Sequence, residues 1–83
     1  MTKESIFEKV QEILVEELDV DKEEVQPDSR LISDIGLSSV ELLSLIAAIE
    51  KAFSFRISEK QLRTFVTTQD IVDCIVANRK EKG

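Results

Sequence analysis

Apolar residues recur every three or four positions along most of the chain, with charged residues between them. This spacing places the apolar side chains on one stripe of a helix. The first such stretch predicts a helix over about residues 2–18, whose other face is charged. Its stripe consists of Ile6, Phe7, Val10, Ile13, Leu14 and Leu18.

A second periodic stretch predicts a helix over residues 39–53. At about 100° per residue, its apolar side chains cluster on one side, which we expect to face the core. The inner side consists of Leu42, Leu45, Ile46, Ile49 and Phe53, and the opposite side of Val40, Ser44, Ala47 and Lys51. Val40 is therefore predicted to be an exposed aliphatic residue near the start of this helix.

Two capping signals mark the starts of a short third helix and of a fourth helix. Ser58 and Gln61 have the spacing of a capping box, and Thr67 and Asp70 repeat it with an acid at the positive helix end. The apolar stripe of the fourth helix consists of Ile71, Val72, Ile75 and Val76. We expect the lysine-rich end, about residues 79–83, to fray.

The stretch between Leu18 and Ser39 is long for a loop in so small a protein. It contains Pro27 and Gly36, and apolar residues are spaced along it. We expect these apolar residues to pin the loop across the helices. They are Val20, Val25, Leu31, Ile32, Ile35 and Leu37.

The 83 residues fit one domain, spanning residues 1–83. With two glycines and one proline, the chain is predicted to be all-α, a four-helix bundle of three main helices and one short helix. The net charge of −6 disfavours nucleic acid or an anionic membrane as a partner. We expect no membrane span and no internal disulfide, which favours a cytoplasmic setting. We also expect a monomer.

Composition also excludes several kinds of chemistry within this chain. There is no histidine and one cysteine, so a Ser-His-Asp triad, a Cys-His dyad and a His- or Cys-based zinc site are excluded. The acidic run that begins at Asp19 fails as an EF-hand, because its sixth and twelfth positions are Glu24 and Arg30. Cys74 is predicted to be partly exposed, with nothing nearby that lowers its pKa.

The most specific segment of the chain is DIGLSSVELL, residues 34–43. If Ser38 is the N-cap of the second helix, Ser38 and Glu41 can form a capping box. Ser39 is then the first helical residue, where the helix dipole stabilises a phosphodiester by roughly 0.3–1 kcal/mol. Gly36 suits a tight turn with a left-handed backbone.

This segment resembles the phosphopantetheine attachment motif of acyl carrier proteins, in which an Asp-aliphatic-Gly turn leads three residues later to a serine, an aliphatic residue and an acid. The order of the predicted helices extends the resemblance over nearly the full chain. It implies that Ser39 receives 4′-phosphopantetheine from coenzyme A and carries acyl groups as thioesters in fatty acid, polyketide or related lipid biosynthesis. The implied partners are a phosphopantetheinyl transferase and acyl-loading and acyl-processing synthases, ligases and acyltransferases. The protein itself is then a carrier and not an enzyme.

The resemblance also implies that partner enzymes dock beside the attachment serine. The candidate docking residues are Asp34, Leu37, Val40, Glu41, Ala47, Glu50, Lys51, Arg56, Lys60 and Arg63. Familiar fatty-acid carriers most often have Asp before the serine and a strongly acidic second helix, whereas this chain has Ser38, Ser44 and Lys51. We therefore predict a specialised carrier with dedicated partners.

Two other functions stay open at this point. A peptidyl or aminoacyl carrier of a nonribosomal pathway has the same fold and differs in its load. An unmodified helical adaptor uses its acidic face to bind a partner. In an adaptor, Ser38 and Ser39 only begin a helix, since serine is common in both positions.

Overall fold

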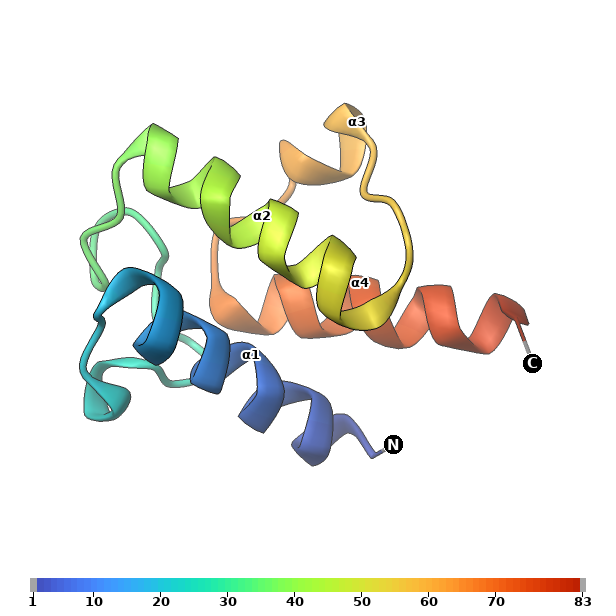
Figure 1. Cartoon of the computed structure of the whole chain (residues 1–83), viewed down its shortest axis with the longest axis horizontal. Coiled ribbons are helices and arrows are strands. Elements are labelled where there is room, and N and C mark those ends of the chain that lie inside the picture. The colour runs from blue at the N-terminus through green and yellow to red at the C-terminus, as the bar shows by residue number, and fades with distance from the viewer. Residues whose placement is uncertain (1, 83) are drawn as a thin grey trace.

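The computed structural model describes residues 2–82 and consists of three long helices and two short ones. The long helices are α1 (Lys3–Leu18), α2 (Ser39–Phe53) and α4 (Thr68–Lys82), and α1 packs against both α2 and α4 (Figure 1). The short ones are the 3₁₀ turn η1 (Lys22–Glu24) and α3 (Glu59–Leu62). Within residues 2–82 there is no strand, only an isolated antiparallel bridge between Arg30 and Thr67. The predicted all-α fold is confirmed.

Caps fix the starts of the helices where the sequence places them. Thr2 is the N-cap of α1, and its Oγ1 accepts a hydrogen bond from the Ser5 N–H at 3.1 Å. Capping boxes begin α2 at Ser38 and α3 at Ser58. The α2 bounds agree with the predicted 39–53, whereas α1 begins one residue later than predicted because Thr2 is its cap.

The α4 start is also confirmed. The Asp70 N–H donates to Thr67 Oγ1 at 3.3 Å, and Asp70 Oδ2 accepts from the Thr67 N–H at 3.0 Å. The helix then continues to Lys82. Gly83 lies outside the described residues, and the fraying of residues 79–83 stays a prediction.

One apolar core joins the three long helices and the loop. Its fully buried members include Val10 and Leu14 of α1, Leu45 and Ile49 of α2, and Ile71 of α4. Burying an aliphatic side chain of this size stabilises the fold by about 1.5–3 kcal/mol. The inner sides predicted for α1 and α2 therefore meet in the core, with Phe7, Leu18, Leu42 and Phe53 half-buried at its margin.

The long loop between α1 and α2 is pinned to the bundle, as the spacing of its apolar residues predicts. The buried residues of the loop are Val20, Val25, Leu31 and Leu37, and Ile35 is half-buried. Backbone hydrogen bonds tie the loop to the segment before α4, among them Leu31 N–H to the Val66 carbonyl at 2.9 Å. The prediction for Ile32 is wrong, because this side chain is 53% exposed. Leu31 takes the inward position at this turn, and its neighbour points to solvent.

Polar contacts complete the link between α1 and its neighbours. Gln11 Nε2 donates to the Val25 carbonyl at 3.0 Å, which holds the loop against α1. The Lys3 ammonium lies 3.1 Å from Asp73 Oδ1 and joins α1 to α4. A hydrogen bond from Gln69 and the nearby Lys3 lower the pKa of Asp73.

Within residues 2–82, no helix is both long and apolar enough to cross a membrane.

Candidate attachment site and docking surface

A tightly bonded turn delivers the chain to the start of α2. Asp34 Oδ2 accepts a hydrogen bond from the Arg30 N–H at 2.8 Å, and the Leu37 N–H donates to the Leu31 carbonyl at 3.0 Å. Gly36 has φ +86°, a left-handed conformation that side-chain-bearing residues adopt at a cost. A Cβ placed on Gly36 would meet no atom within 4 Å, so glycine is required here by backbone conformation and not by crowding.

Ser38 uses its hydroxyl to begin the helix. Ser38 Oγ accepts from the Glu41 N–H at 3.2 Å, and Glu41 Oε1 accepts from the Ser38 N–H at 2.9 Å. The Ser38 carbonyl accepts from the Leu42 N–H at 2.9 Å. The predicted capping box is therefore confirmed. The N–H, the hydroxyl and the carbonyl of Ser38 are all hydrogen-bonded within the first turn.

Ser39 has a different environment although it is the next residue. It is the first residue of α2, it is exposed, and its hydroxyl bonds to no other residue in the described part of the chain. Within that part, the Ser39 and Val40 N–H groups also make no hydrogen bond. These N–H groups and the dipole of a helix of 15 residues favour a negative charge beside the Ser39 hydroxyl. The site therefore fits a covalently attached phosphodiester.

Aliphatic side chains project along the outer side of α2, beginning next to Ser39. Val40 is 72% exposed, as predicted, and Ala47 is also exposed. Leu43 is 56% exposed, which the helical pattern did not single out. The signal was available, since Leu43 lies about 60° from Val40 on the helical wheel at about 100° per residue.

Both acids that flank this outer side are bound to backbone groups. Glu41 belongs to the capping box, and Glu50 Oε2 accepts from the Ile57 N–H at 2.7 Å. Both side chains are half-buried. Glu50 therefore holds the connection between α2 and α3, a structural role that the sequence did not reveal.

The structure brings four candidate docking residues together at the end of α2. Ala47, Glu50, Lys51 and Arg56 line one shallow depression, with Ser54 and Phe55. Lys51 and Arg56 are exposed. This depression and the start of α2 lie at opposite ends of the helix.

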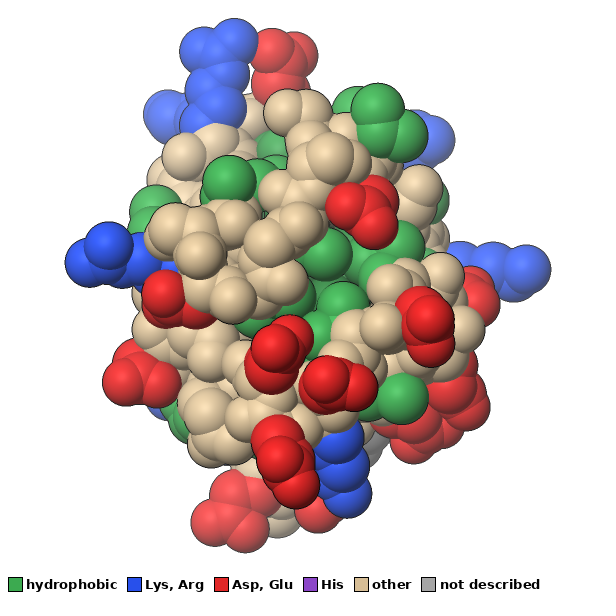
Figure 2. Space-filling view, turned by 90° about the vertical axis from the view of Figure 1, so that its left-hand side faces the viewer, with side chains coloured by type: hydrophobic (Ala, Val, Ile, Leu, Met, Phe, Trp, Pro, Cys, Tyr) green, Lys and Arg blue, Asp and Glu red, His purple; other side chains and the backbone are tan. Residues whose placement is uncertain are grey.

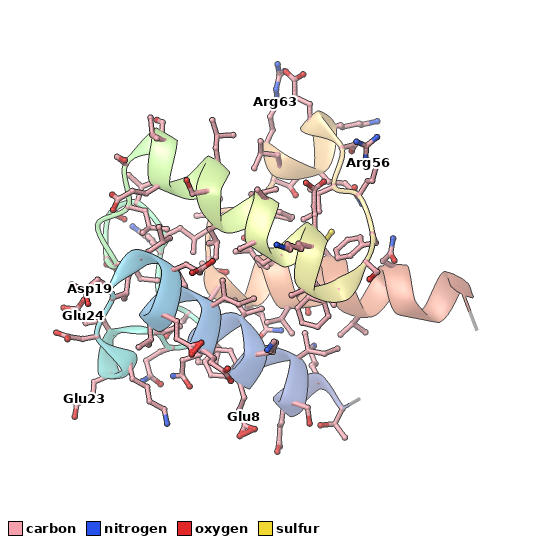
Figure 3. All side chains as sticks on the ribbon, in the orientation of Figure 1. Glu8, Asp19, Glu23, Glu24, Arg56 and Arg63 are labelled. Atoms are coloured by element: carbon pink, nitrogen blue, oxygen red, sulfur yellow. The ribbon has the colours of Figure 1, made fainter. Side chains whose placement is uncertain are left out.

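Other candidates lie elsewhere. Lys60 and Arg63 are exposed on and just after α3, where Arg63 Nη2 is 2.8 Å from Glu59 Oε1 (Figure 3). Asp34 is exposed in the turn before α2. Leu37 is only 4% exposed, so its side chain packs in the core. The prediction that Leu37 offers a docking contact is therefore wrong.

Acidic side chains gather at the loop end of the molecule. Asp19, Glu23 and Glu24 lie there (Figure 3), and Figure 2 views this end directly, with acids spread over its lower part around apolar surface. Among the described residues, no group of acids or sulfur ligands is arranged to hold a metal ion.

Cys74 lies on α4 and is half-buried, as predicted. Burial raises the pKa of its thiol above the ordinary value. The thiol therefore has little thiolate character at neutral pH.

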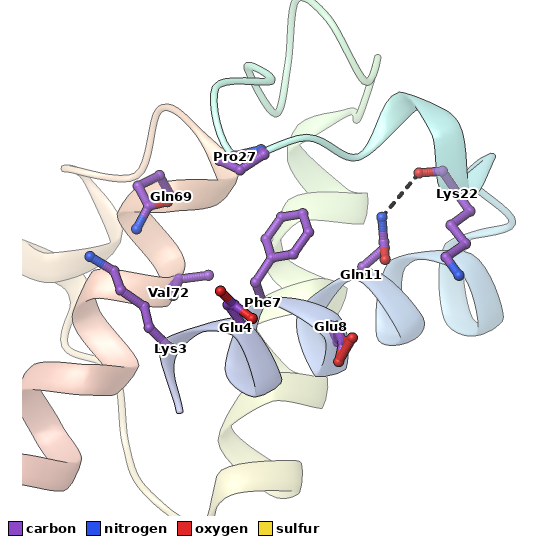
Figure 4. A pocket seen from close by; sticks show the side chains of 9 residues that line it. All are labelled: Lys3, Glu4, Phe7, Glu8, Gln11, Lys22, Pro27, Gln69 and Val72. Carbon is purple, nitrogen blue, oxygen red and sulfur yellow. Dashed lines mark hydrogen bonds between the residues drawn. The ribbon is translucent and has the colours of Figure 1, made fainter. Parts of the chain in front are cut away.

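An open groove that the sequence did not predict lies between α1, the loop and the start of α4 (Figure 4). Phe7, Pro27 and Val72 supply its apolar surface. Lysines and glutamates are mixed along its rim, and no residue of α2 lines it. The groove is therefore separate from the attachment site.

The chain is similar to known carrier proteins over nearly its full length. Residues 8–75 match the family model for the phosphopantetheine attachment site. An acyl carrier protein of Coprothermobacter proteolyticus is 36% identical over 94% of this chain and 95% of its own. Acyl carrier proteins of Solidesulfovibrio magneticus and Helicobacter hepaticus are 39% and 38% identical, over 95% and 88% of this chain and 97% and 96% of their own. The chain belongs to the acyl carrier protein family and contains that family's phosphopantetheine attachment domain.

Proposed function

We propose that Ser39 is the residue of this carrier that receives 4′-phosphopantetheine. One observation supports the choice above all others: the Ser39 hydroxyl is exposed and without a partner residue in the described part of the chain, while the adjacent Ser38 hydroxyl caps the helix. When bound, the group supplies a terminal thiol that holds an acyl chain as a thioester. The role of α2 is to present Ser39 at a helix start that tolerates the phosphodiester charge.

The attachment step needs a partner enzyme. Ser39 Oγ forms a bond to the phosphorus of the phosphopantetheinyl group, the pyrophosphate bond of coenzyme A breaks, and adenosine 3′,5′-bisphosphate leaves. The hydroxyl proton passes to a base of the transferase, since this chain has no histidine and the nearby Glu41 carboxylate is held in its capping box. The protein is then a substrate of a phosphopantetheinyl transferase and has no catalytic activity of its own.

The apolar core offers a place for the carried acyl chain. The core is built from Ile, Leu and Val with a buried Phe65, and the sequence contains no Trp or Tyr. An aliphatic chain entering between the helices meets few polar groups, so its burial has a small polar cost. We propose that the core admits a medium-length acyl chain.

The docking surface sets this carrier apart from ordinary acidic ones. Lys51 and Arg56 are exposed around the depression at the end of α2, and Lys60 adds a further exposed base on α3. Charge complementarity between surfaces steers association and rejects wrong partners. The proposed partners are dedicated cytoplasmic acyl-loading and acyl-processing enzymes that place acids against these bases and apolar groups against Val40 and Leu43.

Intact-mass measurement of the protein purified from its native source tests the attachment. The expected result is a mass increase of one phosphopantetheinyl group, with or without an acyl chain, which fragmentation places on Ser39. An aminoacyl load instead of an acyl load would support a peptidyl carrier. A protein that no transferase can modify would support the unmodified adaptor and contradict the proposal.

A further inference from the structure

Thr68 begins α4 and is fully buried. The cap of α4 is made by its neighbours, Thr67 and Asp70. The Thr68 N–H donates to the Ser29 carbonyl at 3.1 Å. The start of the helix is therefore complete without the Thr68 hydroxyl.

The Thr68 hydroxyl stands out from other buried polar groups because it makes no hydrogen bond within the described part of the chain. Ser29 offers the contrast: it is also buried, yet its Oγ donates to the Glu24 carbonyl at 2.8 Å and accepts from the Gln26 N–H at 3.0 Å. Buried polar atoms nearly always have a partner, and each exception calls for an explanation. Valine is β-branched like threonine and would fill this position without a hydroxyl.

The Thr68 side chain belongs to the inward face of α4. Ile71, Val72 and Ile75 follow it by three, four and seven positions, which is the spacing of one helix face. All three are buried in the core that joins α4 to α1, α2 and the loop. The hydroxyl is thus the polar group on a face of α4 that is otherwise apolar.

We propose that the Thr68 hydroxyl is a hydrogen-bonding site for an oxygen substituent, a hydroxyl or a ketone, on an acyl chain held in the core. This rests on the proposed function, because the chain is brought to the core through its attachment at Ser39. A threonine hydroxyl can donate to a ketone and can accept from a hydroxyl. An oxygenated chain satisfies Thr68, whereas a saturated chain leaves it unsatisfied. The core therefore distinguishes oxygenated cargo from saturated cargo.

Three chains of equal length test this inference. A transferase loads the protein from octanoyl-, 3-hydroxyoctanoyl- or 7-hydroxyoctanoyl-coenzyme A, so that the hydroxyl lies near either end of the chain. Thr68→Val removes the side-chain hydroxyl and keeps the shape, and Thr68→Ser is the matched control that keeps the hydroxyl. The melting temperature of each loaded protein and the Thr68 amide resonance are then measured.

In the wild type, at least one hydroxylated chain is expected to raise the melting temperature above that of the octanoyl form by about 4 °C or more. It should also shift the Thr68 resonance. Thr68→Ser should keep the difference, and Thr68→Val should lose it. The unmodified Thr68→Val protein should melt no lower than the wild type, because it loses a hydroxyl that has no partner.

Two results would overturn the inference. One is a wild type in which hydroxylated chains do not raise the melting temperature above that of the octanoyl form, or raise it by the same amount as in Thr68→Val. The other is an unmodified Thr68→Val protein that melts lower than the wild type, which would mean that a buried water already satisfies the hydroxyl. A failure of loading is seen separately as an unchanged intact mass; it would contradict the attachment at Ser39 and remove this inference with it.

Discussion

Ser38 and Ser39 are adjacent in the chain, yet their hydroxyl groups have different roles at the start of α2. The Ser38 hydroxyl caps the helix, and the Ser39 hydroxyl is the proposed attachment point. Ser38→Ala removes the acceptor of the Glu41 N–H, so it should cost about 1 kcal/mol of stability and leave modification possible. Ser39→Ala should abolish modification by a phosphopantetheinyl transferase with little loss of stability. Urea unfolding and intact mass measure the two effects in the same preparations.

The two variants serve as controls for each other. A Ser38→Ala protein that folds but cannot be modified would mean that the transferase contacts the Ser38 side chain directly. An adduct found on Ser38 in the wild type would contradict the assignment of Ser39.

Among the elements, the connection between α2 and α3 is bonded both to the Glu50 carbonyl and to the Glu50 carboxylate. Glu50→Ala leaves the half-buried Ile57 N–H without its acceptor at 2.7 Å and should lower the free energy of unfolding by about 1–3 kcal/mol. Glu50→Gln keeps an acceptor oxygen and should recover most of this loss. Hydrogen exchange of the Ile57 amide reports the contact directly.

The same pair of variants separates stability from docking. Glu50→Gln removes the charge while keeping the connection, so a partner that places a basic group against Glu50 should bind the variant more weakly. Equal stability of Glu50→Ala and the wild type would show that the carboxylate is not needed by the fold.

The elements that the sequence predicts well are those fixed by nearby residues. The start of α2 follows from Ser38 and Glu41, which lie three positions apart, and the inner stripe of the helix follows from its period. Contacts between distant residues were not predictable in this way. The bond from the Ile57 N–H to Glu50 depends on how the chain turns after α2, and Ile32 is exposed because Leu31 occupies the inward place.

At the scale of the whole molecule, charge is divided between the two ends of the chain. There are 5 basic and 13 acidic residues up to Phe53, and 6 basic and 4 acidic residues from Ser54 onward. Reversing Lys51, Arg56 and Lys60 to Glu should weaken binding to the cognate partner and improve turnover by enzymes that serve ordinary acidic carriers. Both effects should be larger at low salt, where exposed charges are less screened.

Arg63→Glu is a useful comparison, because Arg63 already pairs with Glu59 at 2.8 Å. The reversal should have a smaller effect per charge than at Lys51 or Arg56. If such enzymes turn over the wild-type protein as fast as an ordinary acidic carrier, the specialised docking surface does not exist.

If the acyl chain is buried, it contacts residues throughout the core. Loading with a medium-length acyl chain should shift the amide resonances of Leu45, Ile46 and Ile49 and raise the melting temperature, because a chain inside the core adds apolar contacts to the folded state. A matched sample with only the unacylated arm is the control. Unchanged resonances and melting temperature would place the chain in solvent.

The burial of Cys74 has a consequence for acyl exchange. A thioester moves from one sulfur to another only by attack of a thiolate, and burial raises the pKa of Cys74, so its thiolate is scarce at neutral pH. We therefore expect that the Cys74 side chain does not compete with the arm for the acyl chain. In the modified protein, iodoacetamide at neutral pH should label the arm thiol well before Cys74, and the gap should narrow as pH rises. Peptide mapping distinguishes the two sulfurs, and equal labelling rates at neutral pH would show that Cys74 is open to the same chemistry.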